Sequence, residues 1–510
     1  MKTYLGVELG STRIKAMAVD GACRPVSSGD NTWSARLENG VWTYGLDEVW
    51  AGLRNALSQV EGRENLVAAG VSAMMHGYLA FDRDWNLLVP FRTWQNTMTG
   101  PAAAELTERF GFNIPQRWSV AHLYQAILYC EEHVDRIAHI TTLAGYVHHA
   151  LTGVNAVGIG EASGMFPIDS VRLNYDAGML EEFDRLAASH GVPWMHLRDL
   201  LPDVLPAGEP AGTLTAEGSA LLGGLLLPGL PFAPPEGDAG TGMVATNAVA
   251  PRTGNVSGGT SIFSMVVLER PLEQIHEEID LVTTPAGRPV AMVHCNNCTS
   301  DTNAWAGVLG EAARLFGADP SPGELFTKLY EKSLEGEPDC GGLFVCNYVA
   351  GESVTHMDAG RPLVARRPER TFNLANFFRA QLYSTMATLK IGMDILTRER
   401  VAIDSLTGHG GLFKTPAVGQ RYLAAACNAP VTCMETAGEG GPWGMALLAA
   451  FMMEKGPGET LENYLARRVF TDTHCTTELP RPEDVDGFNT FLAQYKLGLA
   501  VELAAVNSFI

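Results

Sequence analysis

The spacing of hydrophobic and polar positions predicts a mixed α/β chain. Apolar residues over 4–9 and 14–19 flank a Gly-Ser-Thr turn, a pattern typical of a β-hairpin. Helical spacing follows over Leu46–Val60, and Leu66–Ala73 reads as a strand that ends at the segment 74–77. The chain is therefore expected to open with strands joined by tight turns and one helix.

The opening pattern returns near the middle of the chain. Strand-like residues within Arg252–Leu268 flank a second turn of small residues, Gly258–Ser261. Two similar β-turn-β openings predict two related α/β domains with a boundary between residues 245 and 255. We assign residues 1–248 to the first domain and residues 249–510 to the second.

The other segments are mainly helical. Helical patterns dominate 101–150, and a long helix is predicted over Phe372–Arg398. A strand, turn and helix are expected over 405–426, and Gly441–Met453 is predicted to be a buried helix. Residues 206–235 are rich in Gly and Pro and are expected to be irregular.

The negative net charge of the chain disfavours partners that are themselves negatively charged. It has 36 Lys and Arg against 57 Asp and Glu in 510 residues, which gives a net charge of −21. Such a surface repels nucleic acid and anionic lipid, so neither is an expected partner. Glu8 interrupts any signal-peptide stretch, and the longest apolar run, 220–232, is too short to span a bilayer. We therefore expect a cytoplasmic protein.

The nine cysteines, an odd number without a regular framework, indicate reduced thiols. Cys295 and Cys298 form one CxxC pair. Buried thiols are favoured over a structural metal because no second pair follows at zinc-finger spacing.

Three turns of small residues are candidates for binding phosphate: Gly10-Ser11-Thr12, Gly258–Ser261 and Gly408–Gly411. Glycine lets the backbone approach a phosphate closely, and Ser or Thr hydroxyls donate to its oxygens. Any one of them alone is more simply a hairpin corner. None matches a Walker A loop or a dinucleotide fingerprint, which disfavours a P-loop NTPase and a Rossmann dehydrogenase.

Asp238 lies in the Gly-rich segment Gly237-Asp238-Ala239-Gly240. An aspartate in such a turn can cap a helix. It can equally accept a proton from a substrate hydroxyl. The residues by themselves leave both interpretations open.

The order of these motifs resembles the FGGY family of carbohydrate kinases almost end to end. Gly6–Lys15 is similar to the first phosphate motif of that family, Ser257–Ser261 to the second, and Gly237–Gly240 to the motif that carries the catalytic base. Further similar segments are the sugar-contacting turn of xylulokinase-like members at Met75–Gly77, a family loop at Asn347–Glu352, the start of the long helix at Phe378–Ala380, and the adenosine region at Gly408–Gly411 and Gly441–Ala450.

The resemblance implies two actin-like (ribonuclease H-like) domains around a central cleft, with sugar bound mostly by the first domain and nucleotide mostly by the second. It implies ATP and Mg²⁺ as cofactors and Asp238 as the base that deprotonates the attacking hydroxyl. It also implies phosphate contacts at Gly259 and Thr260, facing contacts at Gly10, Ser11 and Thr12, and adenosine near Gly410 and Gly411.

Departures from the family pattern change the expected contacts. Glu8 stands where family members usually carry Asp, a residue implied to orient magnesium through water. Glutamate is one methylene longer and keeps the charge, so we expect Glu8 to keep this role with altered geometry, rather than to be only a strand-end carboxylate. The loop at Asn347 lacks the usual proline, and Ser353 stands where Arg is common.

For the sugar, the resemblance implies contacts at Met75 and His76, and at Trp94 and Asn96, which fall where members often show Trp-x-Asp. Aromatic faces and amides suit hydroxyl-rich ligands. His76 and Trp94 could equally be core residues. Weaker candidates are Trp118, Ser119, His294, Asn296 and Asn297.

The leading hypothesis is an ATP-dependent kinase of a ketose, first of all a xylulose-type ketopentose, that forms a homodimer. Kinases of ribulose, fuculose or a glycerol-like polyol are the nearest alternatives. A non-catalytic ATP- or sugar-binding protein of the same fold is the alternative from another class. Asp238 with both phosphate turns disfavours it, because a binding module needs no base.

Overall fold

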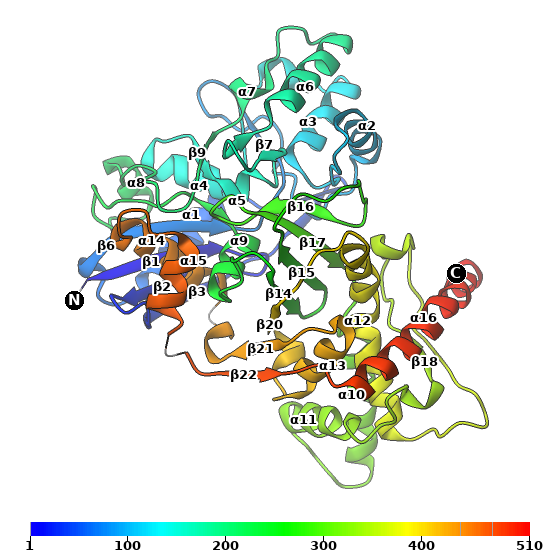
Figure 1. The fold of residues 1–510 in the computed structure, drawn as a ribbon. Coiled ribbons are helices and arrows are strands. Elements are labelled where there is room, and N and C mark those ends of the chain that lie inside the picture. The colour runs from blue at the N-terminus through cyan, green and yellow to red at the C-terminus, as the bar shows by residue number, and fades with distance from the viewer. Residues whose placement is uncertain (1, 439, 472, 510) are drawn as a thin grey trace. The chain divides into compact units, whose positions relative to one another are not determined.

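The computed structural model describes residues 2–438, 440–471 and 473–509 (Figure 1). They form two compact units. The first contains residues 2–250, 280–290 and 440–471, and the second contains 251–279, 291–438 and 473–509. The first unit thus takes in two later segments in addition to the residues before the expected boundary at 248.

The sheet of the first unit has the strand order β13-β6-β1-β2-β3. Its strands are β1 (Thr3–Leu9), β2 (Arg13–Asp20), β3 (Pro25–Thr32), β6 (Leu66–Ala73) and β13 (Glu236–Gly237). β1 and β2 form the predicted hairpin, while β1, β6 and β13 are mutually parallel. Because parallel strands end at the same edge of a sheet, the segments that follow Leu9, Ala73 and Gly237 emerge together.

Two predicted helices pack on this sheet. α1 (Leu46–Ser58) buries Val49, Leu53 and Leu57, and it contacts β2 and β3. α14 (Gly440–Glu454) is almost entirely apolar and packs against β1 and against α9 (Asp238–Ala245). The approach is so close that a Cβ on Gly6 would lie 1.9 Å from the Pro442 carbonyl oxygen. This packing, which joins residues over 430 positions apart, makes 440–471 part of the first unit.

The first unit also contains smaller elements around this core. They are β4 (Arg36–Glu38), β5 (Val41–Thr43), β7 (Leu79–Phe81), α2 (Gly100–Phe110), α3 (Ser119–Leu128), β8 (His139–Thr141), α4 (Leu143–Thr152), β9 (Ala156–Gly158), α5 (Ile159–Ala162), β10 (Ile168–Asp169), β11 (Asn174–Tyr175), α6 (Ala177–Ser189), α7 (Leu197–Leu200), β12 (Asp203–Leu205), α8 (Ala216–Leu221), β16 (Asp280–Thr283) and α15 (Leu461–Tyr464). The irregular path predicted for 206–235 is interrupted by α8, by a bridge between 213 and 231, and by a bridge from Phe232 to Ala69.

In the second unit, six strands follow one another in a sheet in the order β17-β15-β14-β20-β21-β22. These strands are β14 (Thr253–Gly258), β15 (Ile262–Val267), β17 (Pro289–Cys295), β20 (Ser405–His409), β21 (Val431–Met434) and β22 (Cys475–Glu478). β14 and β15 form the second predicted hairpin, and β20 runs parallel to β14 with Ser257 opposite His409. The turns after Gly258 and His409 therefore leave the sheet at one edge.

The second unit contains the helices α10 (Ser300–Leu315), α11 (Pro322–Ser333), α12 (Leu374–Arg398), α13 (Val418–Cys427) and α16 (Pro482–Ser508), with a small ribbon of β18 (Phe344–Cys346) and β19 (Leu363–Ala365). Helices α12 and α13 contact this second sheet, and the other helices of the unit pack on them. α12 confirms the predicted long helix. Its buried Arg379 pairs with Asp484 of α16 at 2.5 Å, which satisfies a charge that would otherwise be costly to bury.

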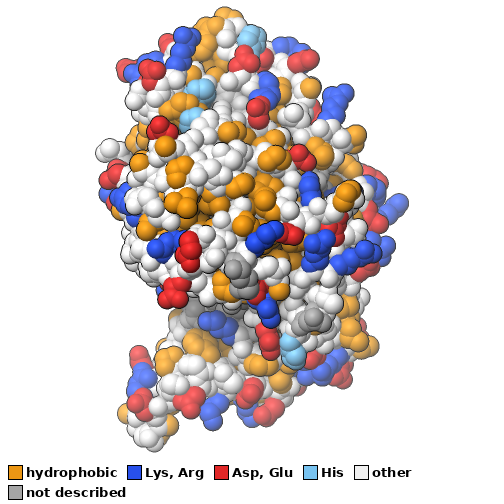
Figure 2. Space-filling model, turned by 90° about the vertical axis from the view of Figure 1, so that its left-hand side faces the viewer, with side chains coloured by type: hydrophobic (Ala, Val, Ile, Leu, Met, Phe, Trp, Pro, Cys, Tyr) orange, Lys and Arg blue, Asp and Glu red, His pale blue; other side chains and the backbone are white. Residues whose placement is uncertain are grey.

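The surface is charged with both signs. Figure 2 shows acidic and basic side chains interspersed on one face. Within the described residues, no helix combines the length and apolar character needed to cross a membrane.

Candidate active site

Asp238 begins α9 directly after β13, at the edge of the first sheet where β1 and β6 also end. Its Oδ1 accepts a hydrogen bond from the backbone N–H of Met75 at 3.1 Å. The side chain is half-buried, so ligand can reach it. The cap of α9 is Gly237 and makes no side-chain cap bond, so the expectation that Asp238 caps a helix is wrong; Asp238 is the first residue of the helix. Its carboxylate is instead fixed by the Met75 N–H at the place where three strands end.

Burial raises the pKa of the Asp238 carboxyl to about 6, although backbone N–H groups of Met75 and Ala239 oppose the shift. A general base is most effective when its pKa lies near the working pH. The Asp238 carboxyl therefore takes up a proton more readily than an exposed aspartate does.

Glu8 lies on β1, two residues before Gly10. Its Oε2 occupies the space beside Gly441, where an added Cβ would lie only 1.5 Å away, and its Oε1 is 3.3 Å from the Cβ position of Gly10. Burial raises the pKa of Glu8 to about 7, the charge of Asp238 adds to this, and Lys15 opposes it. The carboxylate is therefore held between two glycines, close enough to Asp238 to sense its charge.

The Glu8 carboxylate fits the role of one ligand of a magnesium ion that is also bound by the phosphates of a nucleotide. Mg²⁺ in kinase sites is usually held by one or two carboxylates, substrate phosphates and water. Glu8 would supply one such carboxylate. Within the part of the chain that the structure describes, no group of three or more His, Cys, Asp or Glu side chains could hold a metal alone. A metal here would therefore need oxygens from a bound phosphate.

Two further carboxyl groups beside Asp238 were not predicted. Glu236 is buried and accepts hydrogen bonds from the N–H groups of Gly160 at 3.2 Å and Glu161 at 2.9 Å. Burial raises its pKa to about 8 and also raises the pKa of the fully buried Glu161. The Glu236 carboxyl therefore takes up a proton more readily than an exposed glutamate does. Its only signal in the sequence is its place before Gly237.

Met75 and His76 follow β6 in the same region. His76 has a backbone φ of +70°, which is uncommon for a residue with a side chain and indicates local strain. Its ring stacks on Trp118, with centroids 6.4 Å apart, and Nδ1 lies 3.2 Å from the Gly164 carbonyl oxygen. Because a carbonyl only accepts, Nδ1 carries the proton. His76 is thus almost wholly buried, with its ring orientation fixed.

Trp118 and Ser119 support this turn from behind. Trp118 is fully buried, and the Ser119 hydroxyl donates to the Gly77 carbonyl oxygen at 2.6 Å. They hold Met75–Gly77 in place instead of facing a ligand.

Trp94 and Asn96 differ in burial and in how far their polar groups are already hydrogen-bonded. Trp94 is half-buried and packs against the core of the first unit. The Asn96 side chain is buried, donates to the carbonyl oxygens of Trp42 and Thr93, and accepts from the Trp42 N–H. In this structure Asn96 holds β5 and the adjacent turn together.

In the second unit, the turn Gly258–Ser261 is tied to the start of α10. The Thr299 N–H and hydroxyl both donate to the Gly259 carbonyl oxygen, at 3.1 and 2.8 Å, and the Cys298 N–H donates to that of Thr260 at 3.0 Å. Cys298, like Cys295, is a buried free thiol. Gly259 and Thr260 remain accessible, as do Gly410 and Gly411.

Gly410 brings the adjacent turn close to this one. Its φ is +94°, and a Cβ there would lie 2.5 Å from the Gly258 carbonyl oxygen. The structure therefore brings the predicted residues Gly259, Thr260, Gly410 and Gly411 together at one edge of the second sheet.

The loop Asn347–Glu352 is fastened to the same region. Asn297 accepts from the N–H groups of Val349 and Ala350 and donates to Glu352, while the Asn347 amide donates to the Cys298 carbonyl oxygen at 2.8 Å. Asn297 is therefore a structural link in the second unit. Asn296 donates to the Gly351 carbonyl oxygen, and His294 stacks on Phe263.

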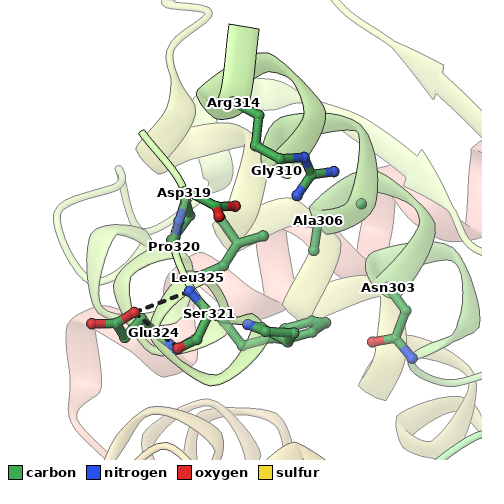
Figure 3. Close-up of a pocket in the computed structure, with 12 residues that line it drawn as sticks. Asn303, Ala306, Gly310, Arg314, Asp319, Pro320, Ser321, Glu324 and Leu325 are labelled. Carbon is green, nitrogen blue, oxygen red and sulfur yellow. Dashed lines mark hydrogen bonds between the residues drawn. The ribbon is translucent and has the colours of Figure 1, made fainter. Parts of the chain in front are cut away.

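The second unit also has a groove of about 830 Å³ between α10 and α11 (Figure 3). Arg314 and Gly310 of α10 face Asp319, Ser321 and Leu325 at the start of α11. The glycine turns Gly258–Ser261 and Gly408–Gly411 are not among its lining residues. The groove is therefore separate from the predicted nucleotide-binding turns.

Comparison with known sequences identifies related proteins along nearly the whole chain. Two xylulose kinases match: that of Haemophilus influenzae is 20% identical over 477 residues, covering 89% of this chain and 91% of its own, and that of Bacillus subtilis is 22% identical over 512 residues, covering 97% and 96%.

Solved structures with a similar fold have different named substrates. A ligand-bound xylulose kinase and a gluconate kinase, both from Lactobacillus acidophilus, each give a TM-score of 0.79 at 16% identity; the first covers 98% of each chain and the second all of both. A glycerol kinase from Plasmodium falciparum with ADP gives 0.74 at 15% identity, covering 99% of this chain and 98% of its own. Such distant similarity shows the fold, which is two actin-like domains, and leaves the substrate open.

Two family models account for most of the sequence. The N-terminal domain of the FGGY family of carbohydrate kinases matches residues 3–245, and the C-terminal domain matches residues 254–453. This chain therefore belongs to the FGGY family of carbohydrate kinases.

Proposed function

We propose that this ATP-dependent sugar kinase phosphorylates a hydroxyl of a ketose, first of all a xylulose-type ketopentose, and that Asp238 is its general base. The observation that carries the proposal is the state of Asp238. Its carboxylate is fixed by the Met75 N–H, is reachable from solvent, and has a pKa raised to about 6.

The reaction follows from this arrangement. Asp238 accepts the proton of the sugar hydroxyl as its oxygen bonds to the γ-phosphorus of ATP. The bond from that phosphorus to the bridging oxygen breaks, and ADP leaves with the electron pair. The Met75 N–H keeps the acceptor oxygen of Asp238 oriented throughout.

Glu8 would hold magnesium, directly or through water, together with the phosphates of ATP. Bound Mg²⁺ neutralises phosphate charge. It would also relieve the repulsion between Glu8 and Asp238, which raises the pKa of Glu8 in the isolated chain. The longer side chain of Glu8 reaches the space left by Gly441.

The small-residue turns would bind the phosphates through backbone N–H groups and hydroxyls. We assign Gly10, Ser11 and Thr12 of the first unit and Gly259 and Thr260 of the second to the phosphates, and Gly410 and Gly411 to the adenosine. Transfer requires the nucleotide held by the second unit to present its γ-phosphate to the hydroxyl beside Asp238.

For the sugar, we assign direct contacts to Met75, His76 and Trp94, and a positioning role to Asn96, whose amide is used by the backbone around it. A ketopentose is favoured because both curated relatives are xylulose kinases. A glycerol-like polyol is the second candidate, since a glycerol kinase has a similar fold. The homodimer and the cytoplasmic location remain predictions.

The test is ADP release from ATP and Mg²⁺ with a panel of xylulose, ribulose, fuculose, glycerol and gluconate. We expect the highest kcat/KM with xylulose. Higher kcat/KM with another member would reassign the substrate, and ATP binding without transfer to any would favour a non-catalytic binding protein.

A further inference from the structure

The turn Gly10-Ser11-Thr12 is held from one side by two aromatic residues of the same unit. The Trp33 indole Nε1–H donates to the Gly10 carbonyl oxygen at 2.6 Å, and the Tyr44 hydroxyl donates to that of Ser11 at 2.7 Å. The backbone N–H of Trp33 donates to the Thr12 carbonyl oxygen at 3.2 Å. Three successive carbonyl groups are thus bonded to one pair of residues, which we call the aromatic brace.

The brace determines where the N–H groups of the turn point. In a trans peptide unit the C=O of one residue and the N–H of the next point in opposite directions. Because the brace binds the carbonyls of Gly10 and Ser11, the N–H groups of Ser11 and Thr12 are directed away from it. Among the residues that the structure describes, none accepts a hydrogen bond from either N–H.

These two donors are accessible. Ser11 is half-buried and Thr12 is exposed. Successive backbone N–H groups without internal partners form the kind of concavity that binds anionic oxygens. The turn is therefore preorganised for phosphate.

We propose that Trp33 and Tyr44 are positioning residues for phosphoryl transfer, which hold the Ser11 and Thr12 N–H groups toward the phosphates of ATP. The inference deepens the proposed function, since it rests on the assignment of this turn to the phosphates.

Packing against neighbouring aromatic rings fixes the two side chains of the aromatic brace. The rings of Trp33 and Tyr44 are in contact, with centroids 4.4 Å apart, and Tyr44 also packs near Phe91 at 6.5 Å. Tyr44 is buried, and burial raises the pKa of its hydroxyl to about 12. The hydroxyl therefore stays protonated, and it remains a donor at any pH at which the enzyme would work.

In the second unit, the carbonyl groups of the turn Gly258–Ser261 are also bound from one side, by residues of a different kind. Thr299 and Cys298 bind the carbonyls of Gly259 and Thr260, which directs the N–H groups of Thr260 and Ser261 the other way. In both turns a glycine N–H donates to a carbonyl oxygen within or just after the turn: that of Gly10 to Arg13 and that of Gly259 to Ser261, each at 2.9 Å. The recurrence in the duplicated hairpin indicates that restraining the carbonyls is part of how each turn binds phosphate.

The experiment compares Trp33→Phe, Tyr44→Phe and the double variant with the full-length wild-type chain. Each substitution keeps a ring and removes one donor. We expect KM for ATP to rise about threefold to tenfold per lost hydrogen bond, with KM for the sugar unchanged. Binding of adenosine, measured by calorimetry, should not change, while binding of ATP should weaken.

Matched controls come from a second Trp–Tyr pair in the same unit. Trp50 and Tyr146 lie with ring centroids 6.0 Å apart and form no bond to the turn. Trp50→Phe and Tyr146→Phe should leave KM for ATP at the wild-type value. A folded double variant with unchanged KM for ATP would overturn the proposal, as would an equal loss of sugar and ATP affinity.

The outcome can be separated from failure of the proposed function. If the wild-type chain transfers phosphate to no sugar, the proposed function fails, yet calorimetry with ATP and adenosine still tests the brace. If the wild-type chain is active and the brace variants match it, only the brace is wrong.

Discussion

The carboxylate of Glu8 fills the space that any side chain at Gly441 would need. A Cβ on Gly441 would lie 1.5 Å from Glu8 Oε2 and 3.1 Å from Thr241 Oγ1. Glu8 comes from β1 and Gly441 from the start of α14, so the proposed metal-orienting group depends on a helix that packs against its strand from the far end of the sequence.

Gly441→Ala should therefore displace Glu8. We expect at least a tenfold loss of kcat, a raised magnesium requirement, and a loss of about 1–3 kcal/mol in the free energy of unfolding, as for other overpacked sites. Magnesium titration of activity and urea denaturation measure these effects. Gly178→Ala on α6 is the control, because its Cβ would meet only Asp176 Oδ1 at 3.4 Å. A normal magnesium dependence in Gly441→Ala would contradict the role given to this contact.

Glu8→Gln separates the charge of Glu8 from its volume. The amide keeps the length of the side chain, so packing beside Gly441 should persist while attraction for a divalent cation falls. We expect the magnesium concentration for half-maximal activity to rise several-fold, with KM for the sugar unchanged. Glu8→Asp keeps the charge and should recover part of the affinity. An unchanged magnesium requirement in Glu8→Gln would make Glu8 structural.

Asp238→Asn should abolish proton abstraction and leave sugar binding intact. We expect turnover to fall by about 10²–10⁴, the usual contribution of a general base, with sugar affinity measured by calorimetry near the wild-type value. Retained turnover would refute the assignment of the base.

Asp238→Asn should also raise the free energy of unfolding at neutral pH. The native pKa of Asp238, about 6, lies above its ordinary value of 3.8, so the native state binds more protons than the unfolded state between these values. The stability of the wild-type chain thus falls as pH rises through this window. Asp238→Asn should be more stable than wild type by about 1–3 kcal/mol at pH 8 and nearly equal at pH 4. Urea denaturation at the two pH values measures the difference.

The pH dependence of catalysis follows from the same pKa. Asp238 acts as a base only when deprotonated, so kcat/KM should rise about tenfold per pH unit below pH 6 and level off above it. The profile is measured with sugar varied and ATP and Mg²⁺ saturating. A plateau that extends down to pH 4 would mean that no group with a pKa near 6 must lose a proton.

The local patterns of the chain predicted most of its elements. Both hairpins, the long helix at 374–398 and the buried helix at 440–454 were predicted, because alternation, helical spacing and glycine turns are properties of neighbouring residues. The association of α14 with the first unit could not be read in this way, since it depends on contacts between Gly6 and Pro442.

In the candidate active site, residues in contiguous motifs could be predicted, whereas residues that reach the site only through the fold could not. Asp238, Glu8 and the glycine turns lie in contiguous motifs, so their resemblance to a family could be recognised. Trp33 and Tyr44 bond to the first turn from segments that follow β3 and β5, and no linear spacing connects them with it. Asn96 was given a sugar contact from its place in a motif, whereas its amide bonds to the backbone of Trp42.

Gly410 offers a test of the adenosine region. Alanine at this position would strain a backbone with φ of +94°, and its Cβ would lie 2.5 Å from the Gly258 carbonyl oxygen, which would push apart the two turns at the edge of the second sheet. We expect KM for ATP to rise at least tenfold in Gly410→Ala, with KM for the sugar little changed. Gly458→Ala is the matched control, because φ there is +71° and a Cβ would meet nothing within 4 Å. Alanine there also adopts a positive φ, at a cost of about 1 kcal/mol, but its Cβ collides with nothing. If Gly410→Ala stays folded and binds ATP as the wild-type chain does, adenosine does not depend on this turn, and the nucleotide must be sought elsewhere in the second unit.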